Sequence, residues 1–225
     1  MKKRKEMSFK PTPVSEELFE YLLKNFSAED DFLTQLRKDA KASGMPEITI
    51  SPVQGAFMQF MLKMLGAGYV LEIGTLGGYS AIIMARAMND SGHLITVELN
   101  PVHAEFAKEK IKEAGLDHII EVVNKSGLDF VNSYKPDKPL DFVFVDADKP
   151  SYYTYLQQLT PYIRQGGIFA ADNAFAFGFL LDAAPERNPD DVKSIISFNT
   201  KFREDKRYFT HLLSVGDGLI LGLKK

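Results

Sequence analysis

The sequence predicts an α/β fold in which a mostly parallel β-sheet is covered by helices on both faces. Short apolar runs typical of strands recur from residue 69 onwards, and the segments between them have the apolar spacing of helices. Strands that alternate with helices imply crossover connections, which make the strands parallel and bury both faces of the sheet. A chain of 225 residues with 45% hydrophobic content can build one substantial core, so we expect a single domain.

The predicted elements follow one another in a regular order. Helices are expected after Ser15, a suitable N-cap, and over residues 28–42 and 52–65. Strands are expected at residues 69–74, 93–99, 119–123, 140–147, 167–172 and 212–223. Further helices are expected at residues 80–88, 101–114, 127–133 and 151–162. The basic, proline-bounded residues 1–13 are expected to form a flexible arm, and residues 14–225 the domain.

Composition excludes several classes of function. The formal net charge of −3 gives no overall attraction to a phosphate backbone, so no nucleic-acid partner is expected. The absence of cysteine excludes disulfides, thiolate catalysis and cysteine-ligated zinc. No apolar run is long enough to span a membrane, and the basic start lacks the apolar core of a signal peptide. We therefore expect a cytoplasmic protein whose partner is a small ligand or another protein.

A glycine-rich turn follows the first predicted strand. Gly74, Gly77 and Gly78 stand between this strand and the next helix, where a bare backbone can turn sharply and approach a ligand. Glu98 ends the following strand, and an acid there can accept hydrogen bonds from both hydroxyls of a ribose. A tight turn without a ligand would also explain the glycines, and Glu98 could instead cap the helix that begins at Pro101.

The charge of Glu72 helps to choose between nucleotide ligands. This acid lies inside an apolar strand, where it needs a partner such as a ligand ammonium group or backbone amides. S-adenosylmethionine carries a sulfonium and an amino group, whereas NAD carries a pyrophosphate that an acidic turn would repel. Glu72 therefore favours the methyl donor over a dinucleotide.

Polar side chains follow two later strands at the point where each strand ends. Asp146, Asp148 and Lys149 follow one apolar strand, and Asp172 and Asn173 follow the next. If these strands are neighbours, their carboxyl ends meet in one crevice. Two carboxylates and an amide oxygen suit Mg²⁺, Mn²⁺ or Ca²⁺. Taken singly, these residues could be helix caps, a solvated charge and a turn.

Five segments together resemble a known family. EIGTLGGYS, VELNP, FVDADKPSYYTY, ADN and SVGDGL occur in this order. They are similar to motifs of the cation-dependent O-methyltransferases of the caffeoyl-CoA and catechol type, and the similarity runs from about Val14 to Leu223. The resemblance implies a Rossmann-like class I methyltransferase fold with a seven-stranded sheet, and a homodimer.

The resemblance also implies roles for individual residues. Asp146, Asp172 and Asn173 match the metal ligands, and Lys149 resembles the catalytic base, acting beside Asp146. The positions that match methyl-donor contacts are Ile50, Glu72, Gly74, Thr75, Gly78, Ser80, Glu98, Gly127, Asp146, Asp148 and Tyr155. The implied acceptor is a catechol-like aromatic with two adjacent hydroxyls, such as a phenylpropanoid or flavonoid. Lys10 falls near a basic residue that touches substrate in the plant enzymes.

The chain departs from the family pattern at several positions. Ile50 replaces a hydroxyl-bearing residue near the donor, Lys125 replaces a glycine, and Phe177 replaces a polar residue that contacts substrate. The loop over residues 174–191 carries three phenylalanines, which could form an aromatic wall for the acceptor or a dimer contact. Two other functions remain open on the same fold, a dinucleotide-dependent oxidoreductase and a non-catalytic nucleotide-binding module.

Overall fold

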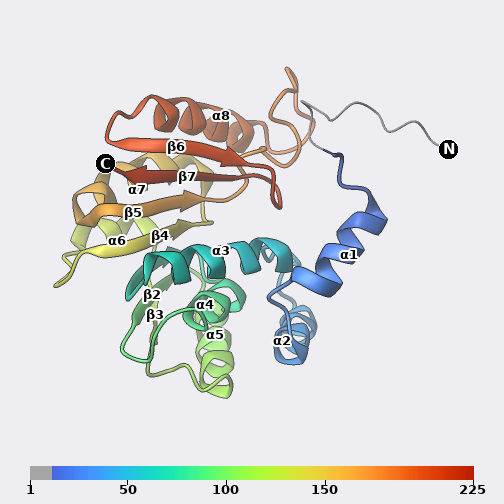
Figure 1. Cartoon of the computed structure of the whole chain (residues 1–225), viewed down its shortest axis with the longest axis vertical. Coiled ribbons are helices and arrows are strands. Elements are labelled where there is room, and N and C mark those ends of the chain that lie inside the picture. Colours follow the sequence, from blue (N-terminus) through green and yellow to red (C-terminus); the bar gives the residue numbers. More distant parts are fainter. Residues whose placement is uncertain (1–11) are drawn as a thin grey trace.

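One sheet runs through the part of the chain that the structure, a computed structural model, describes, which is residues 12–225 (Figure 1). Over those residues its seven strands lie in the order β3-β2-β1-β4-β5-β7-β6. The strands are β1 (Tyr69–Ile73), β2 (His93–Glu98), β3 (Ile120–Asn124), β4 (Leu140–Val145), β5 (Ile163–Ala171), β6 (Tyr208–Leu213) and β7 (Leu219–Lys224). Strands β1 to β5 pair in parallel, and β7 runs antiparallel to β5 and β6. The predicted mostly parallel, seven-stranded α/β fold is confirmed.

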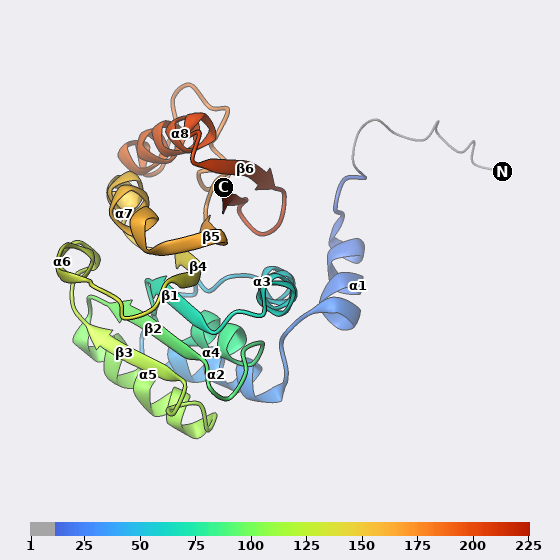
Figure 2. The ribbon, with the colours of Figure 1, turned by 60° about the vertical axis from the view of Figure 1, so that its left-hand side comes forward.

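Helices cover both faces of this sheet (Figures 1 and 2). One face packs against α2 (Asp31–Ala42), α3 (Pro52–Leu65), α4 (Tyr79–Ala85) and α5 (Pro101–Glu113). The other face packs against α6 (Gly127–Ser133), α7 (Tyr152–Leu159) and α8 (Pro189–Glu204). Short 3₁₀ turns, Lys149–Ser151 and Thr160–Tyr162, flank α7. Helix α1 (Glu16–Phe26) lies apart from the sheet, beside α3 (Figures 1 and 2).

The central strand β4 explains why two cores form. Side chains alternate between the faces of a strand, so a strand covered on both sides must be apolar at every position. Phe142 and Phe144 point into the core under α3 and α4, whereas Val143 and Val145 point into the core under α7 and α8. This near-continuous apolar run therefore fixes β4 in the middle of the sheet, with its polar continuation at the carboxyl edge.

Helix starts follow the expected capping chemistry. The side chain of Ser15 accepts a hydrogen bond from the backbone N–H of Leu18, at 3.3 Å. Asn100 caps α5 by accepting from the backbone N–H of Val102, at 2.9 Å. Since Asn100 holds this position, the suggestion that Glu98 caps the helix is wrong.

The C-terminal strand prediction is also wrong in one respect. The run 212–223 is not one strand but parts of two, β6 and β7, joined by a turn over residues 214–218. Gly216 and Gly218 in this turn have φ angles of 57° and 82°, in the left-handed region that a strand does not use. The apolar residues on both sides of the turn concealed this break.

The sequence analysis assigned no helix to the region of α8. Its buried residues Val192, Ile195, Phe198 and Phe202 nevertheless have the spacing of one helical face.

Within the described residues, no helix is long and apolar enough to cross a membrane. The flexible arm was expected over residues 1–13, of which residues 1–11 lie outside the described part of the chain. The expected substrate contact of Lys10 lies outside it as well.

Candidate active site

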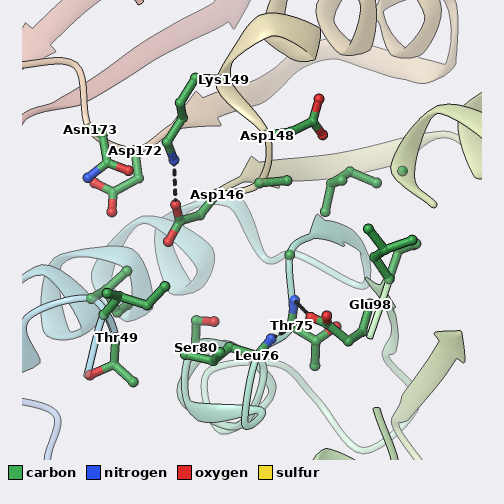
Figure 3. Close-up of a pocket in the computed structure, with 18 of the residues that line it drawn as sticks. Thr49, Thr75, Leu76, Ser80, Glu98, Asp146, Asp148, Lys149, Asp172 and Asn173 are labelled. Atoms are coloured by element: carbon green, nitrogen blue, oxygen red, sulfur yellow. Dashed lines mark hydrogen bonds and ion pairs between the residues drawn. The ribbon is translucent and has the colours of Figure 1, made fainter. Parts of the chain in front are cut away.

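A cavity of about 980 Å³ opens where β1, β2, β4 and β5 end (Figure 3). Strand ends β1 and β4 lie side by side, and β4 also pairs with β5, so their carboxyl termini meet at one edge of the sheet. The cavity is lined by the candidate residues Ile50, Gly74, Thr75, Ser80, Glu98, Gly127, Asp146, Asp148, Lys149, Tyr155, Asp172 and Asn173. Two candidates, Glu72 and Gly78, lie behind this wall.

The glycines of the first turn are required by the backbone itself. Gly74 has a φ angle of 105°, and a Cβ atom there would clash with the carbonyl oxygen of Asp146. Gly78 has a φ angle of 84° and packs against Ala107 of α5. Gly74 thus lets β1 and β4 approach closely at the cavity, whereas Gly78 serves the packing between helices.

Glu98 binds the glycine-rich turn. One carboxylate oxygen accepts hydrogen bonds from the backbone N–H groups of Thr75, at 3.2 Å, and Leu76, at 2.8 Å (Figure 3). The other oxygen accepts from the N–H of Asn100, at 2.9 Å. Since a carboxylate has about four lone-pair sites, Glu98 keeps acceptor capacity on the side that lines the cavity.

Glu72 is fully buried beneath Ser80. Its carboxyl group accepts hydrogen bonds from the hydroxyls of Ser80, at 2.5 Å, and Thr96, at 2.6 Å. Burial raises the pKa of Glu72 to about 8, because the charged form loses its hydration. The partners of Glu72 in the structure are therefore hydroxyl groups, and Ser80 is the residue that faces the cavity.

Another polar contact at the cavity joins α7 to the segment that follows β4. The hydroxyl of Tyr155 donates to Asp148 Oδ1, at 2.5 Å. Burial and the charge of Asp148 raise the pKa of Tyr155 well above its ordinary value, so its hydroxyl stays protonated as a donor. A Cβ atom at Gly127 would collide with this hydroxyl. Glycine at position 127 is therefore explained by the approach of Tyr155 to the start of α6.

The acidic residues after β4 and β5 converge as the sequence predicted. Asp146 and Asp172 extend into the same part of the cavity, next to Asn173 (Figure 3). Burial and the negative charge of Asp146 raise the pKa of Asp172 well above its ordinary value. The buried Lys149 donates from Nζ to Asp146 Oδ1, at 2.9 Å, and to the hydroxyl of Tyr152, at 2.7 Å. Two carboxyl groups thus lie in the same part of the cavity, Asp172 buried and Asp146 partly exposed.

Three side chains with oxygen donors lie in this cluster, the carboxylates of Asp146 and Asp172 and the amide of Asn173. Within residues 12–225, no group of three or more His, Cys, Asp or Glu side chains is placed to hold a metal ion. Carboxylate and amide oxygens are the ligands preferred by hard cations such as Mg²⁺. The side chains Asp146, Asp172 and Asn173 therefore have the right chemistry for such an ion, and they come from neighbouring strands.

Several further residues at this site were not predicted from the sequence. Gln54, on α3, is buried and donates from Nε2 to Asp172 Oδ1, at 2.9 Å. Asp217, in the turn between β6 and β7, accepts from Asn173 Nδ2, at 3.2 Å. Thr49, beside Ile50, also lines the cavity (Figure 3). Asp217 lies in the segment SVGDGL, whereas Gln54 and Thr49 lie outside the five segments, and only the fold brings these residues to the cavity.

The aromatic loop contributes less to the cavity than expected. Of the phenylalanines at 175, 177 and 179, Phe177 lines the cavity, with its ring 6.0 Å from Lys149 Nζ. Phe175 packs at Gly218, and Phe179 packs against the small core formed by Ala176 and α8. An aromatic wall in this loop would therefore consist of Phe177.

Comparisons with known proteins identify the family of this chain. The model of a family described as O-methyltransferase matches residues 24–225. A catechol O-methyltransferase of Niastella koreensis is 37% identical over 171 residues, 75% of this chain and 77% of that protein. A caffeoyl-CoA O-methyltransferase of Medicago sativa is 28% identical over 229 residues, 97% of this chain and 93% of that protein. The crystal structure of an O-methyltransferase from Bacillus cereus in complex with SAH has a TM-score of 0.84 at 30% identity, over 92% of this chain and 96% of that one. This chain therefore belongs to the O-methyltransferase family.

Proposed function

We propose that this enzyme transfers a methyl group from S-adenosylmethionine to one hydroxyl of a catechol-like aromatic, such as a phenylpropanoid or flavonoid, and that it depends on a divalent cation. The observation that carries the proposal is the convergence of Asp146, Asp172 and Asn173 in the cavity that Glu98 also lines. A volume of about 980 Å³ leaves room for a nucleoside donor and a small acceptor together.

The donor would occupy the side of the cavity near β1 and β2. Glu98 would accept hydrogen bonds from the ribose hydroxyls, and Ser80, backed by Glu72, would face the amino-acid part of the donor. Asp148 and Tyr155 would bound the adenine side, beside Gly127. The relative from Bacillus cereus whose structure contains SAH supports this choice of donor.

The cation would be held by Asp146, Asp172 and Asn173, and Mg²⁺ is our first choice, with Mn²⁺ or Ca²⁺ as alternatives. The fit is supported by the two neighbouring carboxyl groups, since burial, together with the negative charge of Asp146, raises the pKa of Asp172. A bound cation lowers the pKa of hydroxyl groups that it contacts, which would favour the phenolate form of the acceptor.

The residues around the cation site would align the acceptor and move its proton. Lys149, whose Nζ lies 2.9 Å from Asp146 Oδ1, would in its neutral form accept the proton of a phenolic hydroxyl. Methyl transfer from a sulfonium to a phenolate brings opposite charges together, so alignment and exclusion of water contribute most of the rate. The ring of Phe177 would limit water access on the acceptor side.

Three broader expectations stay proposals. We propose that residues 14–225 act as one catalytic domain, that two copies form a homodimer, and that the enzyme works in the cytoplasm. Exposed apolar side chains on α1 and α3, Phe26, Phe60 and Met64, support a contact between copies. The absence of cysteine, and therefore of disulfides, is compatible with the reducing cytoplasm.

The two alternative functions have weaker support. A dinucleotide-dependent oxidoreductase would place a pyrophosphate among Glu98, Asp146 and Asp148, where the charges repel it. A non-catalytic binding module would have no use for a lysine buried against a carboxylate. The family assignment favours the methyltransferase over both.

Removal of the cation tests the proposed function directly. Methyl transfer should be measured over catechols, flavonoids and hydroxycinnamoyl thioesters, with labelled S-adenosylmethionine and with or without EDTA. We expect EDTA to stop the reaction and excess Mg²⁺ to restore it, because the acceptor loses the group that favours its phenolate. Full activity after exhaustive chelation would contradict the proposal.

Truncation of Phe177 should weaken acceptor binding. Loss of one aromatic contact is expected to raise the KM for a catechol about three- to tenfold with little change in kcat. Phe179→Ala is the matched control, because Phe179 packs on α8 instead of the cavity. Steady-state kinetics and thermal unfolding of both variants check this. An unchanged KM for Phe177→Ala would remove this ring from the acceptor site.

A further inference from the structure

Two side chains from outside β4 and β5 contact the candidate cation ligands. Gln54 Nε2 donates to Asp172 Oδ1, at 2.9 Å, across a sequence separation of 118 residues. Asp217 Oδ2 accepts from Asn173 Nδ2, at 3.2 Å, and from the backbone N–H of Phe177, at 2.8 Å. The two candidate ligands that follow β5, Asp172 and Asn173, thus each contact a polar side chain from a distant part of the chain.

The orientation of the Gln54 amide follows from its partner Asp172. An ionised carboxylate only accepts hydrogen bonds, so the nitrogen of the amide must face Asp172. The oxygen of the amide faces Gly216, where a Cβ atom would clash with it. Gln54 is 1% exposed, so neither end of the amide can turn to water. With Oδ1 of Asp172 engaged in this way, Oδ2 is left as the oxygen for a cation.

The orientation of Asn173 follows from the same reasoning. The carboxylate of Asp217 can accept only from the amide nitrogen, so the amide oxygen of Asn173 must point away from it. The backbone holds this arrangement, because the N–H groups of Ala174 and Phe175 donate to the carbonyl oxygens of Gly218 and Asp217, each at 2.8 Å. Asn173 itself has a φ angle of 58°, which this pairing maintains.

We propose that Gln54 and Asp217 are positioning residues that select which oxygen of Asp172 and of Asn173 is presented to the cation. The inference rests on the proposed cation dependence and goes beyond it, since it assigns the metal affinity in part to α3 and to the turn between β6 and β7. Partners that orient the ligands of a metal ion commonly contribute about 10- to 100-fold to its affinity.

Mn²⁺ binding tests the role of Gln54 without relying on activity. The full chain is titrated with Mn²⁺ and the free ion is measured by electron paramagnetic resonance. Gln54→Met keeps the length of the side chain but cannot donate, and we expect the Kd for Mn²⁺ to rise about 10- to 100-fold while the Kd for S-adenosylmethionine changes little. Gln59→Met is the matched control on the same helix, because Gln59 donates to the carbonyl oxygen of Ile83, away from the site.

The same titration tests Asp217. Asp217→Asn keeps the shape but can donate as well as accept, so it no longer selects the nitrogen of Asn173. We expect its Kd for Mn²⁺ to rise about tenfold or more. Ala184 N–H donates to Asp182 in the exposed loop, which makes Asp182→Asn the matched control.

A double variant separates positioning from a general loss of structure. If Gln54 acts through Asp172, adding Gln54→Met to Asp172→Ala should not weaken Mn²⁺ binding further. Additive losses would overturn the inference, as would an unchanged Kd in Gln54→Met and Asp217→Asn. Wild-type protein that binds no Mn²⁺ would overturn the cation proposal itself. If Asp172→Ala weakens Mn²⁺ binding but Gln54→Met does not, the cation proposal stands and the role of Gln54 is refuted.

Discussion

Asp146→Asn is expected to lower kcat/KM at a fixed Mg²⁺ concentration by about a thousandfold. A bound cation stabilises the transition state by several kcal/mol, and each factor of ten in rate corresponds to about 1.4 kcal/mol. The substitution keeps the shape of the side chain and removes a charged oxygen from the candidate ligand set. It also removes the negative charge that, together with burial, raises the pKa of Asp172, so the fold should not be weakened through that pair.

Asp148→Asn is the matched control for this prediction. The two aspartates lie two positions apart, but Asp148 accepts from Tyr155 on the donor side of the cavity, whereas Asp146 binds Lys149. We expect Asp148→Asn to raise the Kd for S-adenosylmethionine and Asp146→Asn to raise the Mg²⁺ concentration needed for half-maximal rate. Calorimetric titration with the donor and rate measurements over a series of Mg²⁺ concentrations separate the two effects. Equal loss of both properties in both variants would argue for a general folding defect.

The strand ends could be predicted from sequence because their signal is local. An apolar run that stops at Asp146 and another that stops before Asp172 place both acids at the carboxyl edge of a parallel sheet. The fold class follows from the same alternation of strands and helices. The extra break at Gly216 and Gly218 was hidden, because apolar residues on both sides of the turn make the segment resemble one long strand.

The supporting residues could not be predicted in the same way. Gln54 is one of three polar side chains on a mostly apolar helix, with Gln59 and Lys63, and its significance arises only when α3 packs over the carboxyl end of β5. Glu98 was compatible with two roles until the structure placed Asn100 at the start of α5. The contact of Asp217 with Asn173 depends on the antiparallel hairpin of β6 and β7, which the sequence analysis had merged into one strand. Long-range packing, and not residue type, decides these roles.

Lys149→Met is expected to lower kcat about 100- to 10,000-fold, the usual contribution of a general base, with a KM for the acceptor that stays within about threefold. Methionine fills nearly the same space but cannot accept a proton. Lys149 is buried and bonded to Asp146 and to the hydroxyl of Tyr152, so the base would be held at a fixed place. Single-turnover rates with a catechol, in saturating Mg²⁺, measure the chemical step without product release.

Lys149→Arg distinguishes a base from a mere positive charge. A guanidinium keeps the charge beside Asp146 but does not give up its proton in proteins, so a base role predicts that arginine is as inactive as methionine. A purely electrostatic role predicts that arginine retains most of the rate. Since arginine is larger and could disturb a buried site, Lys149→Ala with added methylamine provides the second measurement. If the rate recovers as the concentration of the neutral amine increases, proton transfer at this position is supported. If Lys149→Arg is active and the amine restores no rate, Lys149 acts through its charge alone.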